Sequence, residues 1–243
     1  MLEGPHLVGE AAKAGLALDP VLATLEFLAG AEGREIARLL PREPTLASVD
    51  VLDSLADADS PKGLLAIAHL PRGGVETLPL RQGGLYLFLG GLQDPGNLGA
   101  IARVAEATGV AGLALSSGSV HPNHPRALRA SAGSLLRLTV AIGATAEGLA
   151  EHLAPHSPTW AALAASGGHD LFTANLRDGK PLILALGAEG PGLSREVEQL
   201  VAREGLLLTI PLEPPVESLN VAVAAAVALF EIRRRRAPWP SSG

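Results

Sequence analysis

The chain contains no cysteine among its 243 residues. This absence excludes disulfide bonds, thiol nucleophiles and metal sites with cysteine ligands. It also suits a reducing compartment, where disulfides rarely persist. We therefore expect a cytoplasmic protein whose chemistry depends on other side chains.

Aromatic residues and long apolar runs are also scarce. Aromatic residues make up 3% of the chain, although hydrophobic residues as a whole make up 47%. The core must be built mainly from alanine, leucine and valine, which helices and parallel strands accommodate. The N-terminus lacks a basic segment followed by an apolar run, and the apolar run at residues 221–230 is too short to cross a bilayer. We expect a soluble protein of one large or two modest domains.

Negative charge is in excess, with a formal net charge of −6. This negative net charge argues weakly against a nucleic-acid partner, because contacts with phosphate need cationic side chains. However, 16 of the 19 basic residues are arginine, and Arg126, Arg129 and Arg137 fall close together. A guanidinium group suits bidentate contact with phosphate, so these three are candidate phosphate-binding residues. The cluster from Arg233 to Arg236 has two interpretations, since arginines at the end of a helix also interact with its dipole.

Several common ligand-binding motifs are missing. The glycine-rich loops loosely resemble a dinucleotide site, but no strand is followed by GxGxxG, which argues against nicotinamide binding. A phosphate loop of the GxxxxGK[ST] type is also absent. His121 and His124 lie in the proline-broken segment HPNHP without an acidic companion. We interpret this segment as a surface turn and predict no metal site.

The first part of the chain predicts a small α/β unit. Helical and strand patterns alternate over residues 4–70, with a strand at VLATLEFL from Val21 and a helix at DVLDSLAD opened by Asp50. Residues 71–84 contain four glycines and two prolines and are typical of a linker. We therefore predict a small domain at residues 1–78, a larger one at 79–236 and a flexible tail at 237–243.

The larger domain alternates strands and helices, which is typical of a mostly parallel sheet with helices on both faces. A turn at Pro95 and Gly96 is expected before the first of these helices, and LLRLTVAI from Leu135 is expected to be a strand. Asn97 and Arg103 are six residues apart, which is not one helical face. If both serve one site, Asn97 must act from the loop and Arg103 from the second helical turn.

Three strand exits are rich in glycine or proline: GGLQDPGNLG, LGAEGPGLS and IPLEPPVESLN. Ligands of such sheets bind beyond the carboxyl ends of the strands, so we expect the site there. The last exit leads into the apolar helix that precedes the arginine cluster. We expect Ser218 to be the N-cap of this helix, with Glu217 and Asn220 beside it at the edge of the core.

Three segments together resemble the motifs of the SpoU family of RNA ribose 2′-O-methyltransferases, in order and at familiar spacing. They are DPGNLGAIARVAEATGV from Asp94, LILALGAEGPGLSREV from Leu182, and LTIPLEPPVESLNVAVAAAVALFE from Leu208. The resemblance covers roughly residues 85–236. The segment before it is similar to a small substrate-binding domain with the fold of ribosomal protein L30e.

The resemblance implies a trefoil-knotted α/β domain that binds S-adenosylmethionine and forms a homodimer, with the last helix as a candidate part of the interface. It implies methyl transfer to a ribose 2′-hydroxyl of RNA. The small first domain favours ribosomal (23S) RNA over transfer RNA. The alternatives are a transfer-RNA 2′-O-methyltransferase and a non-catalytic, ribosome-associated RNA-binding relative.

The resemblance also assigns individual residues. Cofactor contacts fall to backbone and apolar groups, namely Gly187, Gly190, Ile210, Leu212 and Leu219. The catalytic set is Arg103, Asn97, Glu189, Ser218 and Asn220, and RNA contacts fall to Arg126, Arg129 and Arg137. Arg103 has been regarded as a base in this family, but an arginine almost never deprotonates, so we prefer electrostatic stabilisation. Asn97 as a helix start and Ser218 as an N-cap also have purely structural interpretations.

Overall fold

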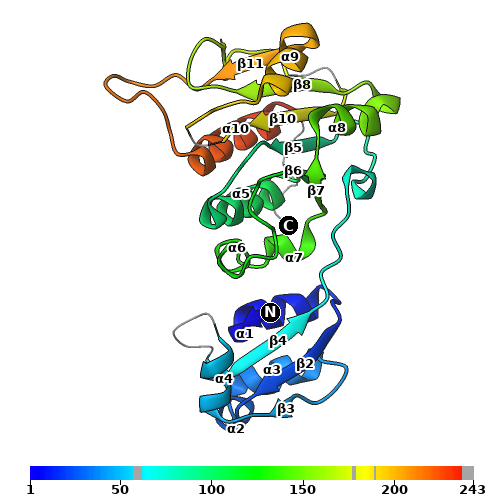
Figure 1. The fold of residues 1–243 in the computed structure, drawn as a ribbon, viewed down its shortest axis with the longest axis vertical. Helices are drawn as coiled ribbons and strands as arrows, with labels where there is room; N and C mark the ends of the chain where they lie inside the picture. Colours follow the sequence, from blue (N-terminus) through cyan, green and yellow to red (C-terminus); the bar gives the residue numbers. More distant parts are fainter. Residues whose placement is uncertain (57–61, 177–178, 189, 237–243) are drawn as a thin grey trace.

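The computed structural model describes residues 1–56, 62–176, 179–188 and 190–236, which form two sheets joined by an extended segment (Figure 1). The first sheet has the order β1-β4-β2-β3, in which β4 is antiparallel to both neighbours and β2 is parallel to β3. Its elements are β1 (Leu2–Glu3), α1 (Gly4–Lys13), β2 (Leu18–Ala23), α2 (Leu25–Ala29), α3 (Ala31–Leu39), β3 (Thr45–Leu46), α4 (Val49–Leu55) and β4 (Leu64–Ala68).

Two predictions for this first half were wrong in detail because hydroxyl caps start helices earlier than expected. The strand predicted from Val21 ends at Ala23, since the Thr24 hydroxyl accepts a hydrogen bond from the Phe27 N–H and begins α2. Helix α4 is capped by Ser48 and not by Asp50, which lies inside its first turn. Serine and threonine in extended backbone are favoured at this position because their oxygen satisfies a free amide.

The second sheet has seven strands in the order β7-β6-β5-β10-β8-β11-β9, and every pairing between them is parallel. This confirms the predicted α/β class with a mostly parallel sheet. Its elements are β5 (Leu85–Leu89), α5 (Pro95–Ala107), β6 (Gly112–Ser116), α6 (Pro125–Ala130), α7 (Ser134–Arg137), β7 (Val140–Ala144), α8 (Ala146–Leu153), β8 (Thr159–Leu163), β9 (His169–Asp170), β10 (Leu182–Leu186), α9 (Arg195–Glu204), β11 (Gly205–Thr209) and α10 (Val221–Arg236).

Both faces of this sheet are covered. Alternate residues of a strand point to opposite faces, so Leu85 and Leu87 pack on one side of β5 while Tyr86 and Phe88 pack on the other. The first side shares a core with α5, α6, α7 and α10. The second side shares a core with α8 and α9. All five residues of β5 and of β10 are buried, as expected for central parallel strands.

Two segments of the second sheet differ from prediction. Leu135 and Leu136 belong to α7, and β7 begins only at Val140. The helical turn starts at Gly133, whose φ of 90° allows a sharp reversal directly after α6. Strand β9 was not predicted, because two residues are too few to show an alternating pattern.

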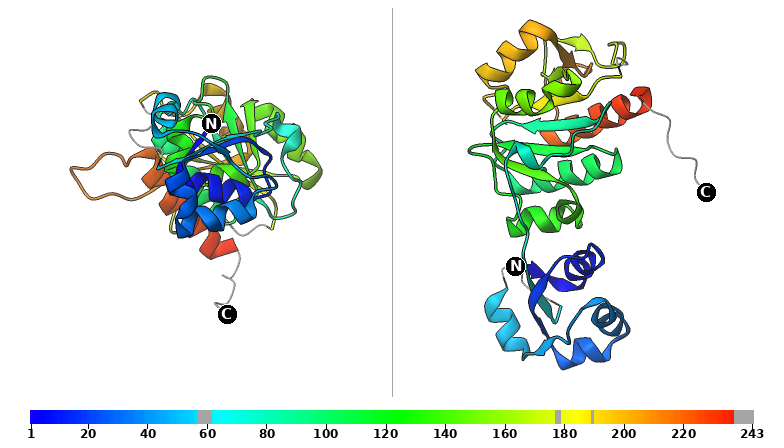
Figure 2. Two further views of the ribbon diagram at one scale, coloured as in Figure 1. Left: turned by 90° about the horizontal axis from the view of Figure 1, so that it is seen from below. Right: turned by 90° about the vertical axis from the view of Figure 1, so that its right-hand side faces the viewer.

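The linker between β4 and β5 is held against the second domain along much of its length (Figure 2). It contains a short 3-10 helix, Val75–Thr77, and Gly73 forms a bridge with Ala141 of β7. The Arg72 guanidinium donates to the Leu135 carbonyl at 2.8 Å, and burial lowers its pKa. Leu78 is buried in the core around α8. The linker therefore restricts how freely the two domains move.

The arginine cluster at the end of α10 holds the helix in place. The Arg235 guanidinium donates to the carbonyl of Ala174 at 2.8 Å, and Arg236 donates to that of Leu176. Arg234 and Arg235 both hydrogen-bond Glu231 and lower its pKa to about 2. These contacts favour the structural interpretation of the cluster. No helix in the described part of the chain has the length and apolar character needed to span a membrane.

Candidate functional site

A cavity of about 740 Å³ opens at the carboxyl ends of β8, β10 and β11. This is the edge of the sheet where ligands of parallel α/β folds bind. Its wall consists mostly of glycine, alanine and leucine. The described lining residues are Leu163, Ala164, Ala165, Leu186, Gly187, Ala188, Gly190, Pro191, Gly192, Leu193, Glu198, Ile210, Leu212, Ser218, Leu219, Asn220, Val221 and Ala224.

One wall of the cavity is the tight loop after β10. Ala188 and Gly192 exchange two backbone hydrogen bonds of 2.9 and 3.0 Å, which close the loop on itself. Gly187 lies so close to this closure that a Cβ atom there would be 2.2 Å from the Gly192 carbonyl group. Gly190 has a φ of 93°, which disfavours any residue with a side chain. The glycines are therefore needed for the shape of the wall.

The opposite wall is the segment that runs from β11 to α10. Ile210, Leu212 and Leu219 supply apolar surface, and Ser218 and Asn220 supply polar groups. All five positions that the family resemblance assigns to the cofactor therefore line one cavity. The structure brings them together, while their role remains a prediction. Sequence reasoning missed Glu198 on α9, the one charged side chain among the described residues of the lining.

Asn220 links this cavity to the neighbouring helix. Its side-chain oxygen accepts hydrogen bonds from the N–H groups of Ala222 at 2.9 Å and Val223 at 3.3 Å, so it caps α10. Its amide nitrogen donates to the side-chain oxygen of Asn97 at 3.2 Å. The prediction that Ser218 is the N-cap was wrong, because α10 begins two residues later than that cap requires. Ser218 lines the cavity instead.

Asn97 and Arg103 both belong to α5, which starts at Pro95. The expected loop position of Asn97 was wrong: it lies in the first helical turn, where its N–H donates to the side chain of Asp94 at 2.7 Å. An aspartate followed by proline is a typical helix start, so the pair Asp94–Pro95 is the sequence signal that could have identified this cap. Asp94 is thus a second residue that sequence reasoning missed.

Arg103 lies six residues further along α5, about 9 Å along the helix axis. Its side chain is exposed, and it does not belong to the cavity lining. Within the described parts of the chain, no carboxylate lies within ion-pair distance of its guanidinium. The candidate Glu189 lies outside the described residues. Arg103 is therefore available to a group that arrives from solution, although Asn97 and Arg103 do not share one face of α5.

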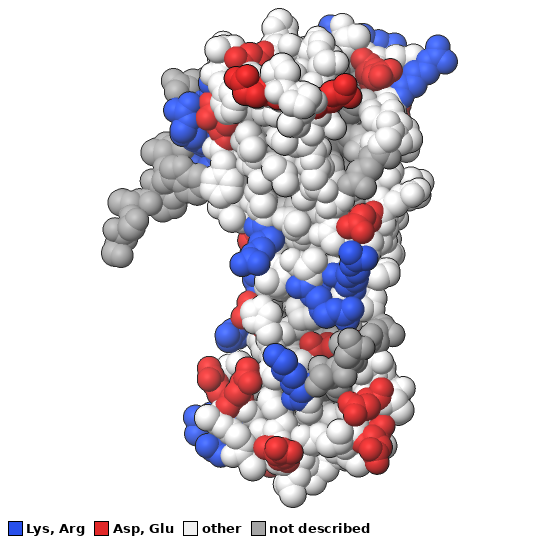
Figure 3. Space-filling model, turned by 90° about the vertical axis from the view of Figure 1, so that its left-hand side faces the viewer, with Lys and Arg blue, Asp and Glu red and all other residues white. Residues whose placement is uncertain are grey.

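The three candidate RNA-binding arginines lie on α6 and α7. Lys and Arg side chains gather where the molecule narrows between its two domains (Figure 3). Arg126 is 64% exposed and lies 3.8 Å from Asp94. Arg129 pairs with Glu3, and Arg137 pairs with residues of both domains. Two of the three arginines thus already hold carboxylates at the border between the domains, while their contact with RNA stays a prediction.

The histidines of the HPNHP segment make local hydrogen bonds. Nδ1 of His124 accepts from the Arg126 N–H at 3.2 Å and caps α6, and Nδ1 of His121 accepts from the Asn123 N–H. Within the described ranges, no three His, Asp or Glu side chains are grouped as a metal site requires. Their visible role is to shape the loop that carries Arg126.

Comparison with known proteins assigns the chain to a family. The SpoU rRNA Methylase family matches residues 84–230. A protein of Synechocystis sp. named as a tRNA/rRNA methyltransferase is 37% identical over 197 residues, which cover 81% of this chain and 69% of that protein. The 23S rRNA (guanosine(2553)-2′-O)-methyltransferase of Bacillus subtilis is 26% identical and covers 96% of this chain and 88% of its own length.

A solved structure agrees with these sequence matches. The AdoMet-bound rRNA methyltransferase of Sinorhizobium meliloti superposes with a TM-score of 0.79 at 26% identity, over 96% of this chain and 85% of that one. The matched region contains the whole parallel sheet, the cavity and α5. The chain therefore belongs to the SpoU rRNA methylase family.

Proposed function

We propose that this protein transfers the methyl group of S-adenosylmethionine to the 2′-hydroxyl of a ribose in ribosomal RNA. The observation that carries the proposal is the hydrogen bond between Asn220 and Asn97. It joins a cavity large enough for a nucleoside ligand to the helix on which Arg103 stands. A ligand in the cavity and a ribose beside α5 would therefore meet at this bond.

The residues around the cavity suit S-adenosylmethionine. Gly187 and Gly190 let the backbone approach a ligand closely, and the leucines offer apolar surface for a flat base. Glu198 adds one negative charge, which favours a cationic ligand. When bound, the sulfonium group of the cofactor supplies an activated methyl group. The relative from Sinorhizobium meliloti was solved with AdoMet bound, which supports the same ligand here.

Arg103 and Asn97 are the candidate catalytic residues. As the ribose oxygen bonds to the methyl carbon, the methyl–sulfur bond would break and sulfur would leave as a neutral thioether. The hydroxyl would lose its proton, and negative charge would develop on its oxygen. An arginine almost never deprotonates, so Arg103 would act by stabilising this charge, and an RNA phosphate or water would take the proton. Asn97, held by Asn220, would position the ribose. We keep Ser218 and Glu189 as candidates for substrate contact and for orienting Arg103.

The link between Asn220 and Asn97 can be separated from the helix cap. Asn220→Asp keeps an oxygen that accepts from the N–H groups of α10 but removes the amide donor to Asn97. We expect methyl transfer to fall about tenfold, the effect of one hydrogen bond of about 1.4 kcal/mol. Asn220→Ala removes the cap as well and should also lower the free energy of unfolding by about 1 kcal/mol. Initial rates and urea unfolding of both variants test this; equal rates in wild type and Asn220→Asp would contradict it.

Ribosomal RNA is the favoured substrate. The relative from Bacillus subtilis, which matches nearly the whole chain, is named for 23S rRNA. The first domain adds a second surface for a large RNA, and Arg126 is exposed beside the start of α5. Transfer RNA is the alternative substrate. We place the reaction in the cytoplasm, as the absence of cysteine suggests.

Three further features of the family belong to this proposal. We infer a trefoil knot in the second domain, supported by the loops after β10 and β11 lining one cavity. We infer an L30e-like first domain at residues 1–78, supported by its compact mixed sheet with flanking helices. We infer a homodimer that uses α10, supported by the exposed apolar side chains of Val223 and Phe230, 50% and 46% accessible.

The direct test is transfer of labelled methyl from S-adenosylmethionine to separated ribosomal and transfer RNA. Label should enter ribosomal RNA, and digestion should recover it as a 2′-O-methyl nucleoside, whose neighbouring phosphodiester resists alkali. Label on transfer RNA alone would show that transfer RNA, and not ribosomal RNA, is the substrate. No label on either fraction, with cofactor still bound, would favour the non-catalytic RNA-binding relative.

A further inference from the structure

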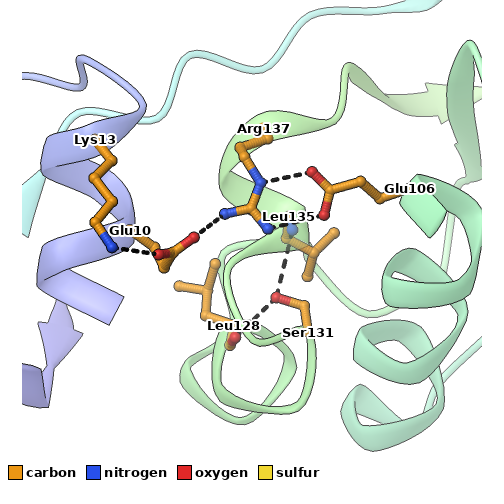
Figure 4. Close-up of polar contacts among 7 residues, drawn as sticks. All are labelled: Glu10, Lys13, Glu106, Leu128, Ser131, Leu135 and Arg137. Atoms are coloured by element: carbon orange, nitrogen blue, oxygen red, sulfur yellow. Dashed lines mark hydrogen bonds and ion pairs between the residues drawn. The ribbon is translucent and has the colours of Figure 1, made fainter. Parts of the chain in front are cut away.

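One guanidinium joins three helices across the border between the domains (Figure 4). The Arg137 side chain on α7 donates two hydrogen bonds to Glu106 of α5, at 2.6 and 2.8 Å. Its third contact is with Glu10 of α1, in the first domain, at 2.5 Å. Lys13 pairs with the same Glu10 at 3.3 Å. The Arg137 side chain thus connects the helix of the candidate catalytic residues to the first domain.

This contact is partly shielded from water. The Arg137 side chain is 33% exposed, and Glu10 lies so close to Gly133 that a Cβ atom there would be 3.0 Å from that of Glu10. The hydrogen bonds from Arg137 lower the pKa of Glu106. A carboxyl group with a lowered pKa stays ionised until the pH falls through that lowered value. The Arg137–Glu106 pair is therefore intact throughout the neutral range.

The rest of the border combines a second ion pair, a cleft and apolar packing. Arg129 pairs with Glu3 at 3.1 Å, and the Glu3 side chain is only 3% exposed. Beside these pairs lies a cleft of about 420 Å³ between the domains, whose lining includes Leu16 and Leu70 from one side and Leu136 from the other. Beyond this cleft, Val8 and Ala11 of α1 belong to the same buried apolar cluster as Leu135 of α7. The directional polar pairs therefore act beside this apolar contact and add to the fixed orientation.

We infer that Arg137 is a positioning residue: with Glu10 it holds the first domain in one orientation on α5 and so sets where bound RNA meets Arg103. Glu106, its partner on α5, lies one helical turn beyond Arg103. Any tilt of the first domain is then a displacement of RNA relative to the reacting groups. The inference rests on the proposed methyl transfer, and it concerns how RNA is placed and not the chemistry.

Positioning and direct RNA contact by Arg137 predict opposite results for Glu10→Gln. This change keeps the size of the side chain, removes its charge and leaves Arg137 paired with Glu106. If Arg137 only contacted phosphate, the loss of Glu10 would release Arg137 and Lys13 for RNA and lower KM. If Arg137 positions the first domain, the looser border raises KM instead.

We would measure kcat and KM for ribosomal RNA with Glu10→Gln and with Glu35→Gln. Glu35 is an exposed residue of α3 in the same domain, with no ion pair among the described residues. Glu35→Gln therefore removes the same charge as Glu10→Gln without breaking an ion pair. We expect KM to rise about three- to fivefold for Glu10→Gln, the range for a partly exposed ion pair. Its kcat and cofactor affinity should stay within about twofold of wild type, and Glu35→Gln should not raise KM.

A distance measurement tests the orientation without relying on activity. Because the chain has no cysteine, Arg38→Cys and Gln199→Cys place one spin label on an exposed position of each domain. Glu10→Gln should broaden or shift the distance distribution, and Glu35→Gln should leave it unchanged. An unchanged distribution, or a KM that falls or stays constant, would overturn the inference. If the wild-type protein showed no methyl transfer, the proposed function would be refuted. The measured distances would still decide whether Glu10 holds the two domains in one orientation.

Discussion

Arg103→Ala is expected to lower the rate of methyl transfer by at least about 100-fold, the usual effect of removing one group that stabilises a developing oxyanion. Arg103 is exposed on α5, stands two turns beyond Asn97 and has no carboxylate partner among the described residues. A guanidinium that pairs with none of the described carboxylates can offer its charge to an incoming oxygen. Because Arg103 does not line the cavity, cofactor affinity should change by less than about twofold.

The control for this variant is another exposed arginine of the same domain. Arg203 lies in the last turn of α9 and makes no ion pair within the described structure, so Arg203→Ala removes the same charge far from α5. Its rate should stay close to that of the wild type. Arg103→Lys should recover only part of the activity, since an ammonium keeps the charge but not the planar fork. Near-normal turnover of Arg103→Ala would refute the assignment of Arg103 as a catalytic residue.

The order of elements in the large domain could be predicted because its signals are local. Ser194 caps α9 and Gly205 follows its end, as the sequence indicated. The buried strands stand out as short apolar runs between turns. The cap of α10 could not be chosen in this way, because both Ser218 and Asn220 are good N-cap residues. The choice is connected to a tertiary contact, the hydrogen bond to Asn97, which lies 123 residues away in the chain.

The arginines of α6 and α7 show a similar limit. Their clustering predicts a basic surface, but the sequence does not tell whether phosphates or carboxylates occupy it. Arg129 and Arg137 pair with glutamates of the first domain that lie 126 and 127 residues away in the sequence. Only the packing of α1 against α7 makes Glu10 a partner of Arg137. For this reason a cluster that looks like an RNA surface in sequence also serves to orient the domains.

Gly187→Ala is expected to weaken binding of S-adenosylmethionine by at least about tenfold, which corresponds to about 1.4 kcal/mol. The added Cβ would lie 2.2 Å from the carbonyl carbon and oxygen of Gly192 and 2.5 Å from the Leu193 nitrogen. These atoms are backbone and are held by the hydrogen bonds between Ala188 and Gly192, so no side chain can rotate away. The loop must move, and the wall of the cavity moves with it. Overpacking of this kind also destabilises a fold by about 1–3 kcal/mol.

Gly90→Ala is the matched control for this prediction. Gly90 follows β5, which pairs with β10, and its N–H donates to the Leu186 carbonyl at the same sheet edge. A Cβ atom at Gly90 would meet nothing closer than 3.6 Å, which is ordinary van der Waals contact. Calorimetric titration with cofactor and urea unfolding of both variants separate loss of the cavity from general loss of stability. Wild-type cofactor affinity in Gly187→Ala would show that the loop after β10 does not shape the cofactor site. The cavity could then no longer be assigned to S-adenosylmethionine.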